Sequence, residues 1–276
     1  MKIFISADME GATGITSVEQ CESDRPEYVF GRQMQRHDVL AAVRGALDGG
    51  ADQVIVNDAH NHMTNLEICD WPRGSTLISG SPKTLGMMEG FEQCDGVFFL
   101  CYHCMAGAKN AVLDHTIDPR VAYSIRLNGV EVGETGINAA AAAGKNIPVA
   151  LVTGDEAVCT EAELLFGKHL TTAAVKKGRG RLSAECLPPC ETNKIIYEAA
   201  INAAQMVSKR KAPVFKVKTP WAIEIDFIRT SQCDAAATLP FVERVSGRTV
   251  RFAGTDLVEM RRYVSAILDL AGTAGF

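Results

Sequence analysis

Short apolar runs recur along the first half of the chain, separated by stretches in which apolar residues follow a helical spacing. The runs cover residues 2–7, 53–57, 76–79, 96–101 and 148–153. They are apolar without strict alternation, which is typical of strands buried on both faces of a parallel sheet. Residues 31–47 carry the clearest helical stripe, and residues 85–91 and 136–143 are also predicted helices. This order predicts an α/β fold, a mainly parallel sheet with helices on both faces.

A two-residue turn signal stands between two further short segments. Asn128 and Gly129 separate residues 123–127 from residues 130–132. Asn-Gly favours the tight turn that joins neighbouring antiparallel strands. We therefore expect a β-hairpin at this position.

The alternation of predicted strands and helices is interrupted near residue 185. Pro188 and Pro189 lie within residues 182–191, which are predicted as a connector. Beyond it the pattern predicts a helix, two strands, a hairpin and an amphipathic closing helix. In order, these are residues 193–208, 214–218, 222–228, 241–245 paired with 249–252, and 255–270. We expect an α/β domain at residues 1–185 and a smaller C-terminal α+β subdomain at residues 190–276.

Composition narrows the class of protein. The 276 residues are 47% hydrophobic and 22% charged, which is the balance of a globular chain. The apolar runs are too short to cross a bilayer, and Asp8 and Glu10 follow the first one where a signal peptide would still need apolar residues. The nine cysteines lack the spacing of a disulfide framework. We expect a reduced, cytoplasmic protein with no membrane partner.

The charge balance argues against a nucleic-acid partner. The chain has 28 basic and 33 acidic residues, for a net charge of −5, whereas binding to phosphate backbones needs a dense basic surface. One basic cluster, at residues 176–181, is interrupted by glycines. It is interpreted as a solvated loop.

Polar side chains gather where the predicted parallel strands end. Five of them are candidate metal ligands: Asp8, Glu10, His60, His103 and Glu134. Asp8 and Glu10 follow the first strand two residues apart, so extended backbone would place them on one face. His60 and His103 follow two later strands, and Glu134 opens a predicted helix. Because the carboxyl ends of parallel strands meet at one edge, these side chains are expected in one pocket.

Taken singly, each of these residues has a simpler explanation. A histidine at a strand end is more often a structural hydrogen-bonding group, Asp8 could cap a turn, and Glu134 suits the positive end of a helix. Taken together, three carboxylates in one pocket would repel one another unless cations hold them. Mixed oxygen and nitrogen ligands suit zinc or a similar ion, and five side chains exceed the need of one open catalytic zinc. The residues alone leave a dinuclear hydrolase site and the simpler explanations both open.

Motifs of other enzyme classes are missing from the sequence. There is no P-loop, no GxGxxG after the first strand, and no Gly-x-Ser-x-Gly of a serine hydrolase. His62 follows the candidate ligand His60 but lies in a polar stretch, and we expect it to be exposed to solvent.

Six segments of the chain match a known pattern in the right order. They are residues 6–11 (SADMEG), 56–60 (VNDAH), 77–80 (LISG), 88–90 (MEG), 133–139 (GETGINA) and 171–176 (TTAAVK). In these segments the sequence resembles the DppA-type D-aminopeptidases, the M55 metallopeptidase family. The resemblance covers most of residues 1–180; after about residue 190 it rests on layout and on residues 222–227.

The resemblance implies two zinc ions per subunit. By the family pattern Asp8 bridges them, Glu10 and His103 complete one site, and His60 and Glu134 complete the other. Residues 1–185 would then form the metal-binding catalytic domain.

The resemblance also implies an activity and an assembly. The chain would release N-terminal D-amino acids, such as D-Ala, from short peptides through water activated by two zinc ions. His115 would be the catalytic residue. The resemblance implies that this residue acts as the nucleophile. Because metal-activated water is already a competent nucleophile, a role for His115 as an acid/base or in stabilising the oxyanion is equally consistent. Asp114 beside it could raise its pKa. The family further implies a ring-like homodecamer that admits short peptides.

Two rival functions remain at this point. A metallo-aminopeptidase or amidase acting on L-peptides or cell-wall peptides would use the same ligands. A non-catalytic, transport-associated peptide-binding protein could share the fold, although a binding protein has no need of an acid/base histidine such as His115. Ligand identity says nothing about the chirality of the substrate.

Overall fold

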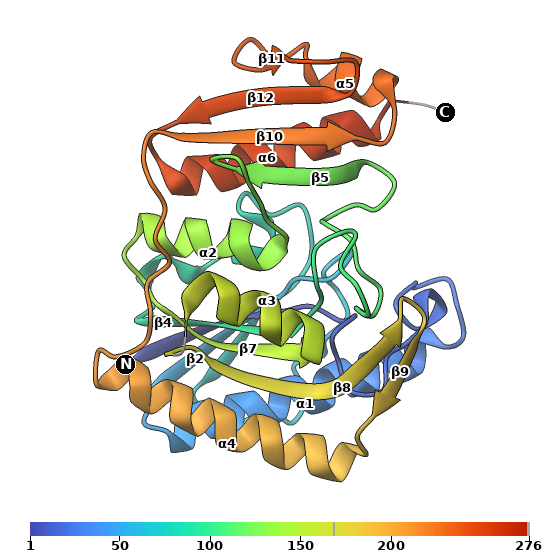
Figure 1. Cartoon of the computed structure of the whole chain (residues 1–276). Coiled ribbons are helices and arrows are strands. Elements are labelled where there is room, and N and C mark those ends of the chain that lie inside the picture. Colours follow the sequence, from blue (N-terminus) through green and yellow to red (C-terminus); the bar gives the residue numbers. More distant parts are fainter. Residues whose placement is uncertain (168, 275–276) are drawn as a thin grey trace.

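The apolar runs of the first half pair into one sheet in the computed structural model, which describes residues 1–167 and 169–274. Its strands are β1 (Lys2–Ala7), β2 (Gln53–Asp58), β3 (Ser75–Ile78), β4 (Gly96–Tyr102), β7 (Val149–Asp155), β8 (Thr171–Gly180) and β9 (Ser183–Cys186). They lie in the order β3-β2-β1-β4-β7-β8-β9. The pairs are parallel except β8 with β9 (Figure 1).

Helices cover both faces of this sheet. α1 (Tyr28–Asp48) and α4 (Pro189–Ser208) pack on one face, and α2 (Glu134–Gly144) and α3 (Glu156–Phe166) pack on the other (Figure 1). Strand β1 serves both cores, because Ile3 and Ile5 join the α1–α4 side while Phe4 joins the α2–α3 side. Gly45 lets α1 approach α4 closely, since a Cβ there would lie 2.4 Å from the Tyr197 carbonyl oxygen.

A second, antiparallel sheet lies beyond α2. Its order is β11-β12-β10-β5-β6, formed by β5 (Ala122–Leu127), β6 (Val130–Glu131), β10 (Trp221–Phe227), β11 (Glu243–Arg244) and β12 (Thr249–Gly254). Helices α5 (Thr230–Ala236) and α6 (Leu257–Gly272) pack against it. Ile137 and Ala140 of α2 face this core, whereas Ala139 and Ala142 face the parallel sheet. Helix α2 therefore joins the two layers (Figure 1).

The predicted fold class is confirmed: a mainly parallel sheet with helices on both faces, and a second, antiparallel α+β part. The sheets interleave along the chain. β5 and β6 precede residue 185 and join the second sheet, while α4 follows residue 188 and packs on the first. The division into residues 1–185 and 190–276 stays a prediction.

Local predictions failed where glycine, proline or a buried charge decides the structure. The helix predicted at residues 85–91 is two short 3-10 turns, η2 (Gly86–Met88) and η3 (Phe91–Gln93), because Gly86 and Gly90 have positive φ angles of 55° and 92°. Residues 214–218, predicted as a strand, form none; prolines at 213 and 220 flank them and lack the N–H that a ladder needs.

The basic cluster at residues 176–181 is not a solvated loop. Residues 176–180 belong to β8, and Lys176 is buried. The connector predicted at residues 182–191 contains β9 and the first turn of α4, and helices α3 and α5 were not predicted.

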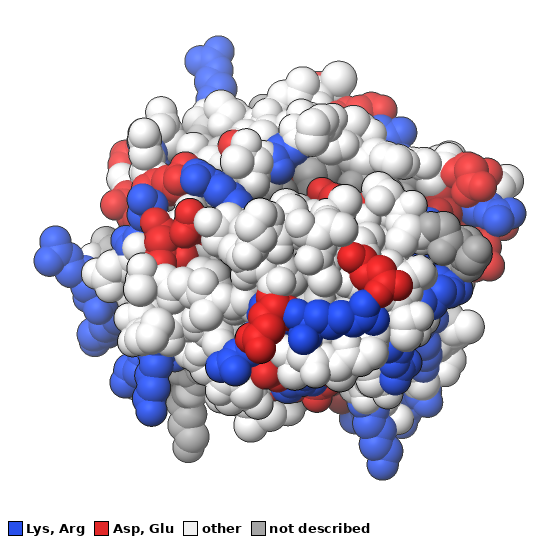
Figure 2. Space-filling model, turned by 90° about the horizontal axis from the view of Figure 1, so that it is seen from above, with Lys and Arg blue, Asp and Glu red and all other residues white. Residues whose placement is uncertain are grey.

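In the part of the chain that the structure describes, no helix has the length and apolar composition to cross a membrane. On the face seen in Figure 2, basic and acidic side chains are intermixed among neutral ones.

Candidate metal centre

The predicted ligands meet at the carboxyl edge of the parallel sheet. β1 lies between β2 and β4, so the segments that follow these strands emerge side by side. Asp8 and Glu10 follow β1, His60 follows β2 and His103 follows β4, while Glu134 is the first residue of α2. All five side chains are buried. The structure thus brings together every ligand that the sequence predicted.

Asp8 lies between two imidazoles. His60 Nδ1 is 3.3 Å from Asp8 Oδ1 and 3.1 Å from Glu10 Oε2. On the other side, His103 Nε2 is 3.5 Å from Asp8 Oδ2 and 3.4 Å from Glu134 Oε1. A carboxylate in this position is suited to bridging two cations.

His115 stacks against this cluster. Its ring lies 3.9 Å from that of His103 at an interplanar angle of 12°, and its Nε2 is 3.9 Å from Glu10 Oε1. Leu113, two residues earlier, has a positive φ of 52° and its N–H donates to the Arg181 carbonyl. This loop conformation turns the imidazole towards the ligands.

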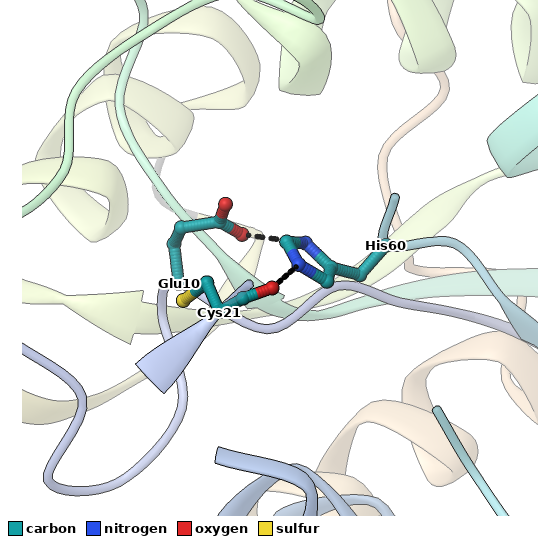
Figure 3. Close-up of side chains that lie close together, drawn as sticks. All are labelled: Glu10, Cys21 and His60. Atoms are coloured by element: carbon teal, nitrogen blue, oxygen red, sulfur yellow. Dashed lines mark hydrogen bonds and ion pairs between the residues drawn. The ribbon is translucent and has the colours of Figure 1, made fainter. Parts of the chain in front are cut away.

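Each of the three imidazoles donates one ring N–H to a backbone carbonyl. His60 Nε2 donates to Cys21 O at 2.9 Å (Figure 3), His103 Nδ1 to Cys104 O at 2.9 Å, and His115 Nδ1 to Leu113 O at 2.7 Å. The other nitrogen of each ring faces the carboxylates. A metal-binding histidine is typically oriented in this way, because the carbonyl sets the tautomer.

The buried carboxylate oxygens and the convergence of donor atoms also fit metal binding. Among the described residues, the buried Asp8 Oδ2 and Glu10 Oε2 accept no well-aligned hydrogen bond, and only the ion-pair contacts with His103 and His60 lie beside them. Buried carboxylate oxygens normally have one, so cations are the natural partners. Candidate ligand atoms converge within 4.8 Å in three groups: Asp8, Glu10 and His103; His103, His115 and Glu134; and Glu10, Cys21 and His60. Oxygen and nitrogen donors of this kind suit zinc.

Burial and mutual charge shift the pKa values of the acids. Burial, together with the neighbouring charge of Glu10, raises the pKa of Asp8 to about 7. Burial also opposes ionisation of Glu134, but His103 outweighs it and lowers the pKa of Glu134 to about 2. His60 and His115 likewise hold the pKa of Glu10 well below its usual range.

The histidines divide into two kinds. Burial disfavours the charged form of His60 and His103, yet Glu10 and Glu134 respectively raise their pKa values well above the usual range. Burial and the charge of His103 lower the pKa of His115. The suggestion that Asp114 raises the pKa of His115 is therefore wrong, because Asp114 accepts from Gly107 N and pairs with Arg181 instead.

The loop after β1 is held from several elements. Gly11 N donates to the Cys101 carbonyl, and a Cβ at Gly11 would lie 2.0 Å from the Tyr102 carbonyl oxygen, so only glycine fits there. Gln35 of α1 donates to Asp8 O at 2.9 Å, and Asp38 of α1 accepts from Thr13 N at 2.8 Å. These contacts fix the backbone that carries two candidate ligands, Asp8 and Glu10.

Sequence reasoning missed two residues near the ligands. Cys21 lies in a turn, away from any strand end, so neither spacing nor periodicity indicated that it approaches His60 and Glu10 (Figure 3). Lys176 stands at the start of the basic cluster; the available signal was that it directly follows residues 171–175 (TTAAV), a short run typical of a strand. His62 is exposed, as predicted.

Comparisons with known proteins identify relatives of this chain. The family model for peptidase M55, described as D-aminopeptidase, matches residues 1–266. A curated D-aminopeptidase from Bacillus subtilis (strain 168) is 32% identical over 278 residues, which cover 100% of both chains. The solved structure of the Zn-dependent D-aminopeptidase DppA from Bacillus subtilis, described as a self-compartmentalizing protease, has a TM-score of 0.94 and 30% identity over 100% of both chains. This chain belongs to the peptidase M55 family of D-aminopeptidases.

Proposed function

We propose that this chain is a zinc-dependent aminopeptidase that releases N-terminal D-amino acids, such as D-Ala, from short peptides. One observation carries the metal-dependent chemistry: Asp8 lies between His60 and His103, whose remaining ring nitrogens are set by backbone carbonyls. Membership of a D-aminopeptidase family, and similarity to a Zn-dependent relative, support the metal and the substrate class.

The proposal includes two zinc ions per subunit. Asp8 would be shared, Glu10 and His103 would complete one site, and His60 and Glu134 would complete the other. The convergence of Asp8, Glu10 and His103 supports the first site. His60 lies beside the shared Asp8, which supports a second site on that side of the carboxylate. Glu134 is assigned to this site by the family resemblance, since its contact in the structure is with His103. When bound, zinc lowers the pKa of a coordinated water and polarises the scissile carbonyl.

His115 is proposed as the acid/base residue. The Leu113 carbonyl holds the proton on Nδ1, so Nε2 offers its lone pair towards the ligands. With its proton held on Nδ1, the neutral ring can accept a proton at Nε2. The same Nε2 can then donate that proton to the leaving amine nitrogen. This assignment does not require His115 to attack the peptide.

The test is release of amines from D-Ala-D-Ala and L-Ala-L-Ala in parallel, with zinc-loaded protein and a chelated control. Zinc-dependent cleavage of the D-dipeptide alone is the expected result. Cleavage of the L-dipeptide alone would retain the hydrolase and reject the D-specificity. Activity on neither, nor on longer and cell-wall peptides, would favour the peptide-binding alternative.

We further propose a cytoplasmic homo-oligomer, a decamer by family resemblance. The nine cysteines are free, which suits a reducing compartment. A self-compartmentalizing relative and exposed apolar residues such as Tyr123, Val130 and Leu164 support assembly.

A further inference from the structure

Lys176 is a buried lysine whose ammonium group binds one short loop. It lies on β8 and is 2% exposed. Its Nζ donates to Glu10 O at 2.6 Å, Ala12 O at 2.8 Å and Ile15 O at 2.7 Å. An ammonium group has three N–H donors, so these three carbonyls satisfy it fully.

The loop bound by Lys176 carries a proposed metal ligand. Residues 8–15 follow β1, and the first of the three carbonyls belongs to Glu10 itself. The contacts from α1 hold other points of this loop, at Asp8 O and Thr13 N. Lys176 is therefore bonded to the peptide unit from which the Glu10 side chain projects.

The loop path explains why a lysine stands here. The carbonyls of residues 10, 12 and 15 converge on one point, as they would around a small cation. A compact ammonium matches that arrangement, whereas the planar fork of arginine spreads its donors over several atoms. An apolar side chain would leave three buried carbonyls without this partner.

We propose that Lys176 is a positioning residue of the metal centre. By gathering the three carbonyls, it holds the turn that directs the Glu10 carboxylate towards Asp8 and His103. The inference rests on the proposed function, since it assumes that Glu10 binds metal. Lys176 itself touches neither metal nor substrate in this role.

The test compares Lys176→Met and Lys176→Arg with Lys177→Met. Lys177 is the neighbouring residue on β8, is exposed and pairs with Glu156 at 3.1 Å, so it controls for the loss of a lysine from this strand. Competition with a chromophoric chelator measures zinc affinity. We expect Lys176→Met to bind zinc about 10- to 100-fold more weakly, as for other residues that orient ligands. Lys176→Arg should lose less, and Lys177→Met should match the unmodified chain.

Two further measurements separate positioning from general destabilisation. Hydrogen exchange of residues 8–16 in the metal-free proteins should be faster in Lys176→Met. Val250→Ala, in the core of the second sheet, serves as a variant of lowered melting temperature and should retain zinc affinity.

The outcomes are distinct. Zinc affinity of folded Lys176→Met equal to the unmodified chain, or reduced only as much as in Val250→Ala, would overturn the proposal. If Lys176→Met does not fold, Lys176→Arg decides by the same criterion. If the unmodified chain binds no zinc, the proposed function fails and this inference fails with it.

Discussion

His115 is the residue whose role differs most between the two mechanisms considered. Its Nδ1–H donates to the Leu113 carbonyl and its Nε2 faces Glu10, so Nε2 is the atom that can accept and release a proton. We expect His115→Ala to lower kcat by about 10²- to 10⁴-fold, which is the usual loss for an acid/base residue, while zinc content stays unchanged.

The exposed His62 provides the matched control, and His62→Ala should retain both rate and metal. Steady-state kinetics and elemental analysis on the same samples test the prediction. Loss of zinc from His115→Ala would indicate that His115 binds the metal, as its position beside His103 and Glu134 would allow. Full activity would remove it from the mechanism.

Asp8 and Glu134 should differ in how much metal each one holds. Asp8 contacts both His60 and His103, whereas Glu134 contacts His103. Asp8→Asn keeps the shape but removes the charge, so we predict loss of both zinc ions. Glu134→Gln should lose one. Zinc per chain, measured by elemental analysis after dialysis, decides; an Asp8→Asn protein with two zinc ions would contradict a shared ligand.

The cluster of candidate ligands could be predicted from the sequence because the ends of the strands can be recognised in it. The apolar runs end at Ala7, Asn57 and Cys101, and a parallel sheet then brings the following polar residues together whatever their distance along the chain. The same logic could not find Cys21 or Lys176. Cys21 reaches the site through a turn, and Lys176 through side-chain length from a strand that pairs with β7 rather than β1.

At the scale of elements, the loop after β1 passes so close to the backbone at the end of β4 that position 11 requires glycine. A Cβ at Gly11 would lie 2.0 Å from the Tyr102 carbonyl oxygen, and backbone cannot yield as a flexible side chain does. We expect Gly11→Ala to lower the free energy of unfolding by about 3 kcal/mol and to weaken zinc binding, because the ligand loop must move.

Gly180→Ala is the matched control, since the nearest atom to a Cβ there is the Ser183 hydroxyl oxygen at 3.6 Å and its φ is not positive. Denaturant unfolding of both variants checks the prediction. A Gly11→Ala protein as stable as Gly180→Ala would show that the loop adapts easily.

Element types were predictable where periodicity is strong. The strands around the site and helices α1, α2, α4 and α6 agree with their sequence patterns within a few residues. The errors lie where local chemistry does not follow periodicity. Two positive-φ glycines interrupt the helix predicted at residues 85–91. The end of β8 has the basic, glycine-rich sequence of a loop, but it forms a strand in which the Lys176 ammonium group is hydrogen-bonded inside the protein.

At the scale of the whole molecule, metal binding and folding should be coupled. Three buried carboxylates, Asp8, Glu10 and Glu134, lie within one cluster, and cations that bind only the folded chain stabilise it. Removing zinc with a chelator should lower the melting temperature, and zinc at about 100 times its Kd should restore about 2.7 kcal/mol for each site that it fills. Calorimetry with and without chelator tests this; an unchanged melting temperature would contradict it.

Exposed apolar side chains surround one cavity on the surface of the protein. Leu164 of α3 is 83% exposed and Val130 of β6 is 61% exposed. Both line a cavity of about 570 Å³ whose other lining residues include Met105 and Val132. A large apolar side chain at the rim of an apolar hollow usually marks a contact surface. If the proposed homo-oligomer forms, we expect a second copy of this chain to cover this surface.

Leu164→Glu should therefore lower the mass measured by sedimentation while leaving zinc per chain unchanged, since Leu164 is no ligand candidate. Val245→Glu is the control, because Val245 is 51% exposed but lies beside β11 in the second sheet, away from this cavity. A decamer that persists in Leu164→Glu and dissociates in Val245→Glu would place the interface on the antiparallel sheet instead. A monomeric unmodified chain would reject the assembly itself, and the active site would then have to exclude longer peptides by its own loops.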